Sequence, residues 1–186
     1  WGHRDDGSWG VLDANSATDA DLWLAWALAE AGRRWNEPAY HDLSRTLGAR
    51  ILRDSVAEVP RLGPVLLPAP GGFRDADGGV RLNPAYLPLQ VLRGLAAAHP
   101  DQRERWLALI ETSITVLQRS APRGLVPDWV HVDRDGRFAF EGAADAGGGY
   151  DAIRVYLWLG LLDEADPARR TLLRRFRPMA HLVRRH

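Results

Sequence analysis

Apolar side chains recur every three or four positions along most of this 186-residue chain, which is the spacing of helices with one buried face. The clearest case is 17–35, where apolar positions such as Leu22 and Ala29 would share one side. Ser16 and Thr18 stand at its start as cap formers, each with an aspartate three residues later. Further helices are expected at 38–57, 84–98, 101–120, 149–164 and 167–185.

A shorter segment, Val126 to Phe140, alternates more as strands do. Asp133 to Gly136 supplies turn residues in its middle, so a small β-hairpin is expected there. The helix pairs share no recurring residue signature, which argues against a helical repeat array. The chain is therefore predicted to be mostly α, with about six helices and a small β-hairpin insert.

Composition limits the number of domains and the kinds of partner. With 46% apolar residues, the chain can bury one substantial core, so we expect one domain or part of one. The formal net charge of +0 gives no reason to expect nucleic acid or an anionic membrane surface as a partner. No apolar run approaches the roughly 20 residues that cross a bilayer, so no transmembrane segment is expected. The chain opens on Trp1 and its only methionine is Met179, so we expect further residues upstream.

Cysteine is absent, which excludes disulfides and thiolate nucleophiles. The histidines are scattered and lack the two-histidine helical spacing of a zinc protease, so we expect no metal and no cofactor. The arginine-rich end, Arg169 to Arg185, could suggest nucleic acid, but Leu172, Phe176 and Leu182 interleave as one apolar stripe. We therefore expect those arginines on the solvated face of an amphipathic helix.

The first candidate for chemistry is Asp19. On a helix, Asp19 and Asp21 lie about 200° apart, whereas Asp19 and Trp23 share a face one turn apart. A carboxylate beside an aromatic plane suits a sugar subsite. Equally, Asp19 can be a first-turn acid that favours the helix dipole, with Trp23 in the core.

Two further segments combine polar and aromatic residues. Asn83 stands just before a helix, where it can cap the backbone, and Pro84 can take an early helical position. Tyr86 is either a core aromatic or a site residue. Asp128 and Trp129 form a second polar and aromatic element, which is weak evidence when taken alone.

The last cluster begins with the glycine run 147–149 and continues through Tyr150 and Asp151 to Arg154. Glycine allows the backbone to approach a ligand closely. Arg154 lies three residues after Asp151, within reach of its carboxylate. A neighbouring cation stabilises a carboxylate in its charged form, which a general base needs to take a proton from water. The alternative is a structural ion pair at a helix start.

Taken together, Ala17 to Trp35 resembles the signature stretch of glycoside hydrolase family 8, with Leu24 and Ala29 as mild departures. Within that family, the chain is most similar to the endoglucanases of bacterial cellulose synthesis operons. Three further motifs follow in the expected order: Arg81–Pro88, Val126–Val130 and Tyr150–Trp158.

The resemblance implies an (α/α)6 barrel, of which this chain would be an incomplete portion, with 1–186 forming part of a single catalytic domain. It implies an inverting endo-β-1,4-glucanase that hydrolyses cellulose or a related β-glucan. The implied localisation is periplasmic or secreted, and the implied partners are a β-1,4-glucan and, functionally, a cellulose synthase complex.

The resemblance also implies roles for individual residues. Asp151 matches the general base, and Asp19 matches the acid that grips and distorts the sugar at the cleavage point. Tyr86 and Arg154 match residues around the attacking water. The remaining cleft-lining candidates are Asn83, Trp9, Asp128, Trp129 and Tyr150.

One required residue has no match. Inversion needs a second, protonated carboxyl group roughly 6.5 to 9.5 Å from the base. In the family this is a glutamate well before the Asp19 stretch, so we expect the general acid upstream of Trp1. A positioned acid contributes about 10² to 10⁴-fold, so these residues alone are expected to be nearly inactive.

Three alternatives stay open at this stage. The chain could be a non-catalytic glucan-binding relic that lacks the acid altogether. It could belong to a family 8 hydrolase that acts on xylan, chitosan or mixed-linkage glucan. It could also be a helical protein-interaction domain, which would leave the Asp151 cluster without a role.

Overall fold

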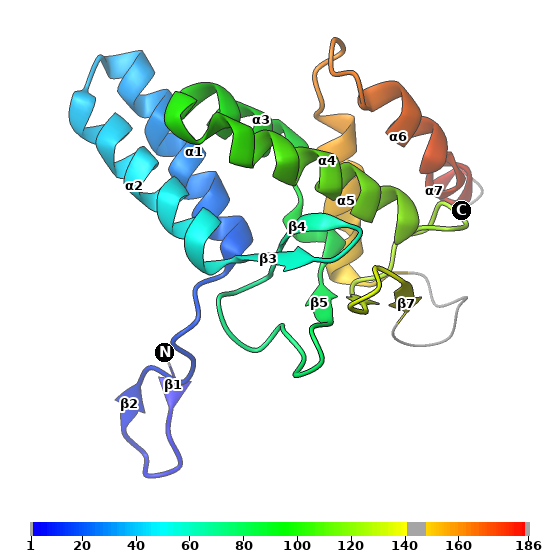
Figure 1. The fold of residues 1–186 in the computed structure, drawn as a ribbon, viewed down its shortest axis with the longest axis horizontal. Coiled ribbons are helices and arrows are strands. Elements are labelled where there is room, and N and C mark those ends of the chain that lie inside the picture. The colour runs from blue at the N-terminus through cyan, green and yellow to red at the C-terminus, as the bar shows by residue number, and fades with distance from the viewer. Residues whose placement is uncertain (1, 141–147, 185–186) are drawn as a thin grey trace.

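The computed structural model describes residues 2–140 and 148–184. Within these ranges the chain is mostly helical, and the helices pack as pairs with small sheets along one side (Figure 1). The helices are α1 (Thr18–Trp35), α2 (Pro38–Asp54), α3 (Leu89–Ala98), α4 (Arg103–Arg119), α5 (Tyr150–Gly160), α6 (Arg169–Arg175) and α7 (Arg177–Val183), with short 3₁₀ helices η1 (Pro84–Tyr86) and η2 (Pro100–Gln102).

The strands are short and antiparallel. They are β1 (Gly2–His3), β2 (Trp9–Gly10), β3 (Val56–Val59), β4 (Gly63–Leu66), β5 (Val80–Leu82), β6 (Val130–Val132) and β7 (Phe138–Phe140). The hairpin predicted within 126–140 is confirmed as β6 and β7, and β5 pairs with the other edge of β6. The hairpins β1–β2 and β3–β4 were not predicted, because strands of two to four residues are too short to show alternation.

Helices α1 and α2 form a hairpin with a local sequence explanation. α1 ends at Asn36, whose left-handed backbone (φ 52°) is one that asparagine tolerates. Pro38 opens α2, and the Glu37 carboxylate accepts a hydrogen bond from the Ala39 N–H at 3.2 Å. Close packing depends on Gly32, because a Cβ there would lie 2.9 Å from the His41 ring.

The start of α1 differs from the prediction, because neither Ser16 nor Thr18 caps it. The N-cap residue is Ala17, which makes no side-chain cap bond. Thr18 is buried as the first helical residue, and its N–H donates to the Pro68 carbonyl at 2.9 Å. Contact with the chain that follows β4 therefore fixes where α1 begins.

Two predicted helices are each divided at a proline. The segment 84–98 splits into η1 and α3 because the residue before Pro88 is disfavoured from helical backbone angles. The segment 167–185 splits at Phe176 into α6 and α7. Pro178 has no N–H to bond the carbonyl one turn earlier, so a single helix cannot continue.

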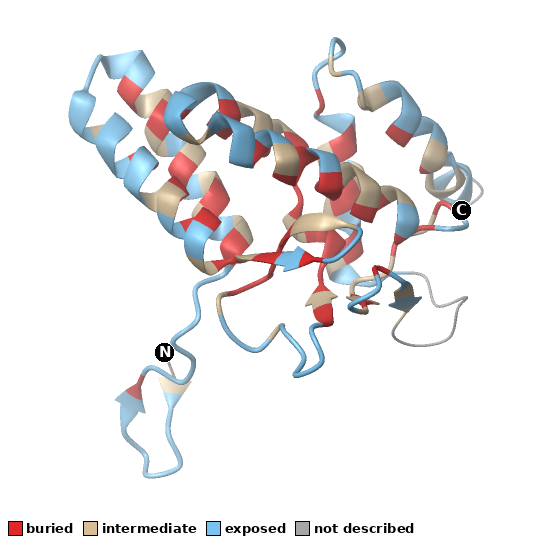
Figure 2. Ribbon diagram, viewed as in Figure 1, coloured by how far each residue is buried: buried red, intermediate tan, exposed pale blue. Residues whose placement is uncertain are grey.

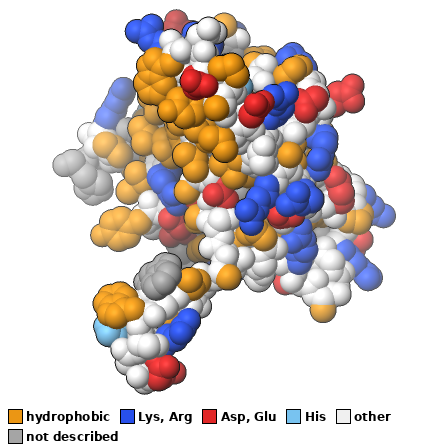
Figure 3. All heavy atoms as spheres, turned by 90° about the vertical axis from the view of Figure 1, so that its left-hand side faces the viewer, with side chains coloured by type: hydrophobic (Ala, Val, Ile, Leu, Met, Phe, Trp, Pro, Cys, Tyr) orange, Lys and Arg blue, Asp and Glu red, His pale blue; other side chains and the backbone are white. Residues whose placement is uncertain are grey.

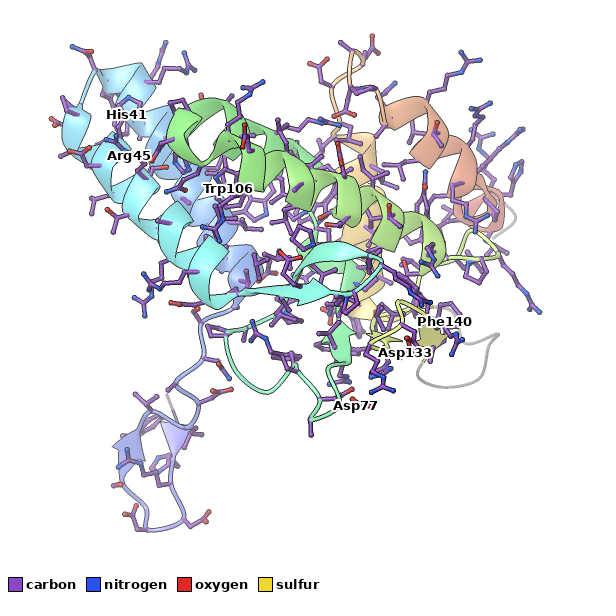
Figure 4. The ribbon with its side chains drawn as sticks, in the orientation of Figure 1. His41, Arg45, Asp77, Trp106, Asp133 and Phe140 are labelled. Atoms are coloured by element: carbon purple, nitrogen blue, oxygen red, sulfur yellow. The ribbon has the colours of Figure 1, made fainter. Side chains whose placement is uncertain are left out.

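The core lies where the helices face one another, as the buried residues in Figure 2 show. Trp106 of α4 is completely buried there and is labelled in Figure 4. None of the helices in the described ranges is long and apolar enough to cross a membrane.

One histidine belongs to this core. His99 is 1% exposed, and its Nε2 lies 2.9 Å from Ser44 Oγ. The Ser44 hydroxyl donates its proton to the Ala25 carbonyl at 2.6 Å, so Nε2 must be the donor toward Ser44. Burial lowers the pKa of His99, which keeps the imidazole neutral at neutral pH.

Candidate active site

Five of the predicted site residues come together where three segments meet. Asp19 comes from the first turn of α1, and Asp151 and Arg154 come from the start of α5. Asn83 and Tyr86 lie at the two ends of the stretch that contains η1. We call this group the carboxylate cluster: Asp19, Asn83, Tyr86, Asp151 and Arg154.

Arg154 joins the two acids of the carboxylate cluster. Its Nη1 donates to Asp19 Oδ2 at 2.6 Å, and its Nη2 donates to Asp151 Oδ1 at 2.7 Å. The side chains of Asp19, Arg154 and Asp151 are 16%, 32% and 37% exposed, so the group is partly shielded from water. One guanidinium thus fixes two carboxylates, of which Asp151 lies 3 positions and Asp19 lies 135 positions before Arg154 in the chain.

The two carboxylates of the cluster stabilise the charged form of Arg154. Burial alone would lower the pKa of Arg154, but the nearby charges of Asp19 and Asp151 outweigh it and raise that pKa. Burial also raises the pKa of Tyr86, and the negative charge of Asp19 adds to the effect. The Arg154 Cζ lies 5.3 Å from the centroid of the Tyr86 ring. At neutral pH the cluster therefore holds a guanidinium cation and a neutral phenol.

Asn83 caps η1, which is one of the roles predicted for it, and it also binds Asp151. Its Oδ1 accepts from the Ala85 N–H at 3.0 Å and caps η1, while Pro84 takes the first helical position, as predicted. Its Nδ2 donates to Asp151 Oδ2 at 2.9 Å. Both oxygens of Asp151 are therefore held, one by Asn83 and the other by Arg154.

An aromatic cluster packs near these residues. Trp23 lies 5.4 Å from Trp26 and 5.2 Å from Trp158, measured between ring centroids. The Trp158 Nε1 donates to the Ala85 carbonyl at 3.0 Å and ties α5 to η1. Trp158 was not among the predicted site residues, although its position two helical turns after Asp151 could have indicated it.

The glycine run is used differently from the prediction. We expected it to admit a ligand, but a Cβ on Gly148 would lie 2.3 Å from the Val126 carbonyl oxygen, and one on Gly149 would lie 2.5 Å from Asp128 Oδ2. These two glycines therefore accommodate the protein's own chain. Gly147 lies outside the described residues.

Three other candidates lie in different surroundings. Trp129 stacks on Phe73 with ring centroids 5.9 Å apart, and the Arg81 Cζ lies 4.0 Å from the centroid of the Trp129 ring. Trp9 is 66% exposed and contacts His3 on the β1–β2 hairpin, which projects away from the helices in both views (Figures 1 and 3). Tyr150 is 94% exposed. Phe73, which stacks on Trp129, was not among the predicted site residues.

Comparison with known proteins identifies the family. The sequence profile of "Glycosyl hydrolases family 8" matches residues 1–185, and the chain belongs to this family. An endoglucanase of Salmonella typhi is 43% identical over 183 residues, which are 98% of this chain and 48% of that protein. An endoglucanase of Xanthomonas axonopodis pv. citri is 46% identical over 173 residues, which are 93% of this chain and 44% of that protein.

A solved structure gives the same result for the fold. The crystal structure of endo-1,4-D-glucanase from Vibrio fischeri ES114 matches with a TM-score of 0.87 and 41% identity, covering 100% of this chain and 53% of that one. The predicted fold class is therefore confirmed: the chain forms a portion of the (α/α)6 barrel of family 8. It spans about half the length of the curated relatives it matches.

Proposed function

We propose that this chain supplies the general base and part of the glucan-binding cleft of an inverting endo-β-1,4-glucanase. The observation that carries the proposal is the fixed carboxylate of Asp151, held by Arg154 and Asn83. The names of the relatives, endoglucanase and endo-1,4-D-glucanase, support a β-1,4-linked glucan as the substrate.

In the proposed reaction, a water molecule attacks the anomeric carbon while Asp151 takes its proton. Arg154 and Asn83 orient the two oxygens of Asp151, and the neutral Tyr86 hydroxyl can form a hydrogen bond to the same water. Asp19, fixed by Arg154, accepts hydrogen bonds from hydroxyl groups of the sugar at the cleavage point and favours its distorted ring.

The leaving oxygen needs a proton from a general acid. Inversion requires this acid on the opposite side of the sugar, roughly 6.5 to 9.5 Å from the base. We propose that a glutamate of the same catalytic domain, in a segment preceding these residues, supplies it. We further propose that the protein acts in the periplasm or outside the cell and that it works on glucan made by a cellulose synthase complex.

Release of reducing ends from carboxymethylcellulose by the full-length gene product tests the activity. Replacement of a general base costs about 10² to 10⁴-fold, so Asp151→Asn is expected to lose activity by that amount. Asp163→Asn is the matched control, because Asp163 is an exposed acid that accepts from the Ala165 N–H, a bond that the amide oxygen can keep. Wild-type activity that persists in Asp151→Asn would refute the assignment of the base.

A second measurement tests inversion. NMR of the products immediately after cleavage is expected to show the α-anomer first, since water attacks from the side opposite the leaving oxygen. The β-anomer appearing first would contradict the inverting mechanism. Parallel assays on xylan, chitosan and mixed-linkage glucan separate cellulose from the other substrates, and binding without cleavage of any of them would indicate a glucan-binding relic.

A further inference from the structure

The helix that carries Asp151 lacks a side-chain cap of its own. The N-cap residue of α5 is Gly149, which has no side chain to accept the first backbone N–H groups. Such groups need an acceptor when a helix start lies against other parts of the protein. Asp151 is the second residue of α5, so whatever fixes this first turn also fixes the position of the base.

Asp128 provides the missing acceptor from a distant part of the chain. A single oxygen, Asp128 Oδ1, accepts from the Gly149 N–H at 2.9 Å and from the Ala152 N–H at 2.8 Å. These two donors bracket Tyr150 and Asp151 in the sequence. The negative charge of a carboxylate is also favourable at the positive end of a helix dipole.

The glycines before α5 are shaped for this contact. A Cβ on Gly149 would lie 2.5 Å from Asp128 Oδ2, and a Cβ on Gly148 would lie 2.1 Å from Ala152 Cβ. Both distances are too short for atoms that are not bonded to each other, so a side chain at either position would displace α5 or Asp128. Gly149 therefore leaves room for the Asp128 carboxylate, and Gly148 leaves room for the Val126 carbonyl and for Ala152.

The same segment contacts α5 once more, further along the helix. The Val126 N–H donates to the Tyr156 hydroxyl oxygen at 3.0 Å. The segment from Val126 to Asp128 is thus bonded to α5 at its start and again more than one turn later. These three bonds set both the position and the direction of the first turns of α5.

We infer that Asp128 is a positioning residue for Asp151, acting through the first turn of α5, whereas the sequence had suggested a cleft-lining residue. This inference rests on the proposed function, because it assigns Asp128 to the placement of the proposed base. Asp128 Oδ1 is occupied by two backbone donors, and Oδ2 faces Gly149. Its carboxylate is therefore used for the helix.

The expected effect is on turnover and not on substrate binding. A misplacement of about 1 Å can cost roughly 10²-fold in rate. Asp128→Ala is expected to lower kcat roughly 10- to 100-fold, with little change in KM. Asp128→Asn keeps an amide oxygen that can accept both N–H groups, so it is expected to restore most of the lost kcat.

The experiment compares these variants in the full-length gene product with carboxymethylcellulose. The matched control is Asp133→Ala in the turn between β6 and β7 (Figure 4). Asp133 Oδ1 also accepts two backbone N–H groups, from Asp135 and Arg137, each at 2.8 Å. Removal of the Asp133 carboxylate breaks two bonds of the same kind in another part of the fold, so kcat is expected to stay at the wild-type value.

Gly149→Ala changes the other side of the contact. It is expected to lower kcat in the wild type, and to have a smaller effect when Asp128 is already alanine, because the opposing carboxylate is gone. Together with Asp128→Asn, this variant gives a result even where Asp128→Ala folds poorly.

The outcomes separate this inference from the proposed function. A wild type without activity refutes the proposed function and this inference together. An active wild type in which Asp128→Ala retains full kcat refutes only the inference. A raised KM in both Asp128→Ala and Asp128→Asn, with kcat unchanged, shows direct contact with the glucan and also refutes it. Loss of kcat in Asp128→Ala with recovery in Asp128→Asn supports it.

Discussion

Replacement of Arg154 by methionine gives the sharpest test of the carboxylate cluster. Arg154 donates to Asp19 at 2.6 Å and to Asp151 at 2.7 Å. Hydrogen bonds between charged groups contribute about 1.5 to 3 kcal/mol each. At the low end of this range the two bonds sum to about 3 kcal/mol. Because the Arg154 side chain keeps 32% exposure, solvent screening reduces the sum, and we expect about 2 kcal/mol less unfolding free energy.

Arg33→Met is the matched control. Arg33 donates to Glu30 at 2.7 Å with the same three-residue spacing as the Arg154–Asp151 pair. Arg33 is 69% exposed against 32% for Arg154, and Glu30 is 45% exposed against 37% for Asp151. An exposed pair of this kind contributes little, so the variant should unfold like the wild type. The difference between the variants therefore isolates what partial burial and the second carboxylate add.

The assay is equilibrium unfolding in urea at neutral pH, followed by circular dichroism. Arg154→Met is expected to unfold at lower urea with an unchanged dependence on denaturant, which indicates a change in stability alone. If Arg154→Met and Arg33→Met unfold at the same urea concentration, the two carboxylates are not held by Arg154 in solution and the described geometry of the site is wrong.

Three further predictions concern packing in the helical core and next to the site. Stability should fall as the pH drops through 6.5, the ordinary pKa of histidine, because burial lowers the pKa of folded His99 and the unfolded chain then binds more protons. In urea unfolding across pH 5 to 7, the stability of His99→Gln should depend less on pH than that of the wild type. Gly48→Ala should lower the unfolding free energy by about 1 to 3 kcal/mol through overpacking, since its Cβ would lie 2.7 Å from the His99 ring. A Cβ at Gly160 would meet nothing within 4 Å, so Gly160→Ala should show no such loss in the same assay. Trp158→Phe should cost about 1 kcal/mol through loss of its bond to the Ala85 carbonyl, and an unchanged urea midpoint would show that this bond is not formed.

Local features of the fold followed from the sequence. The helix expected at 17–35 is observed at Thr18–Trp35, and the helix expected at 101–120 is observed at Arg103–Arg119. Apolar periodicity and flanking prolines act over a few residues, so they can be recognised without the tertiary structure. The contact between Asp151 and Arg154 was predictable for the same reason, because three-residue spacing places two side chains on one helix face.

The division of 84–98 and 167–185 into shorter pieces was also encoded locally, by Pro88 and Pro178, but the periodic pattern obscured it. The start of α1 was not local. Its first N–H bonds the Pro68 carbonyl, and a partner 50 positions away (68 − 18 = 50) leaves no signal in the capping pattern.

Sequence alone thus determined which residue types were available for chemistry and which helix each would occupy, because those properties depend on neighbours along the chain. Only the tertiary structure decided that Arg154 also binds Asp19, 135 positions away, and that Asp128 caps α5 from 24 positions before Ala152. Such contacts depend on how helices pack across long loops, and packing is set by the shape and burial of the whole core and not by local periodicity.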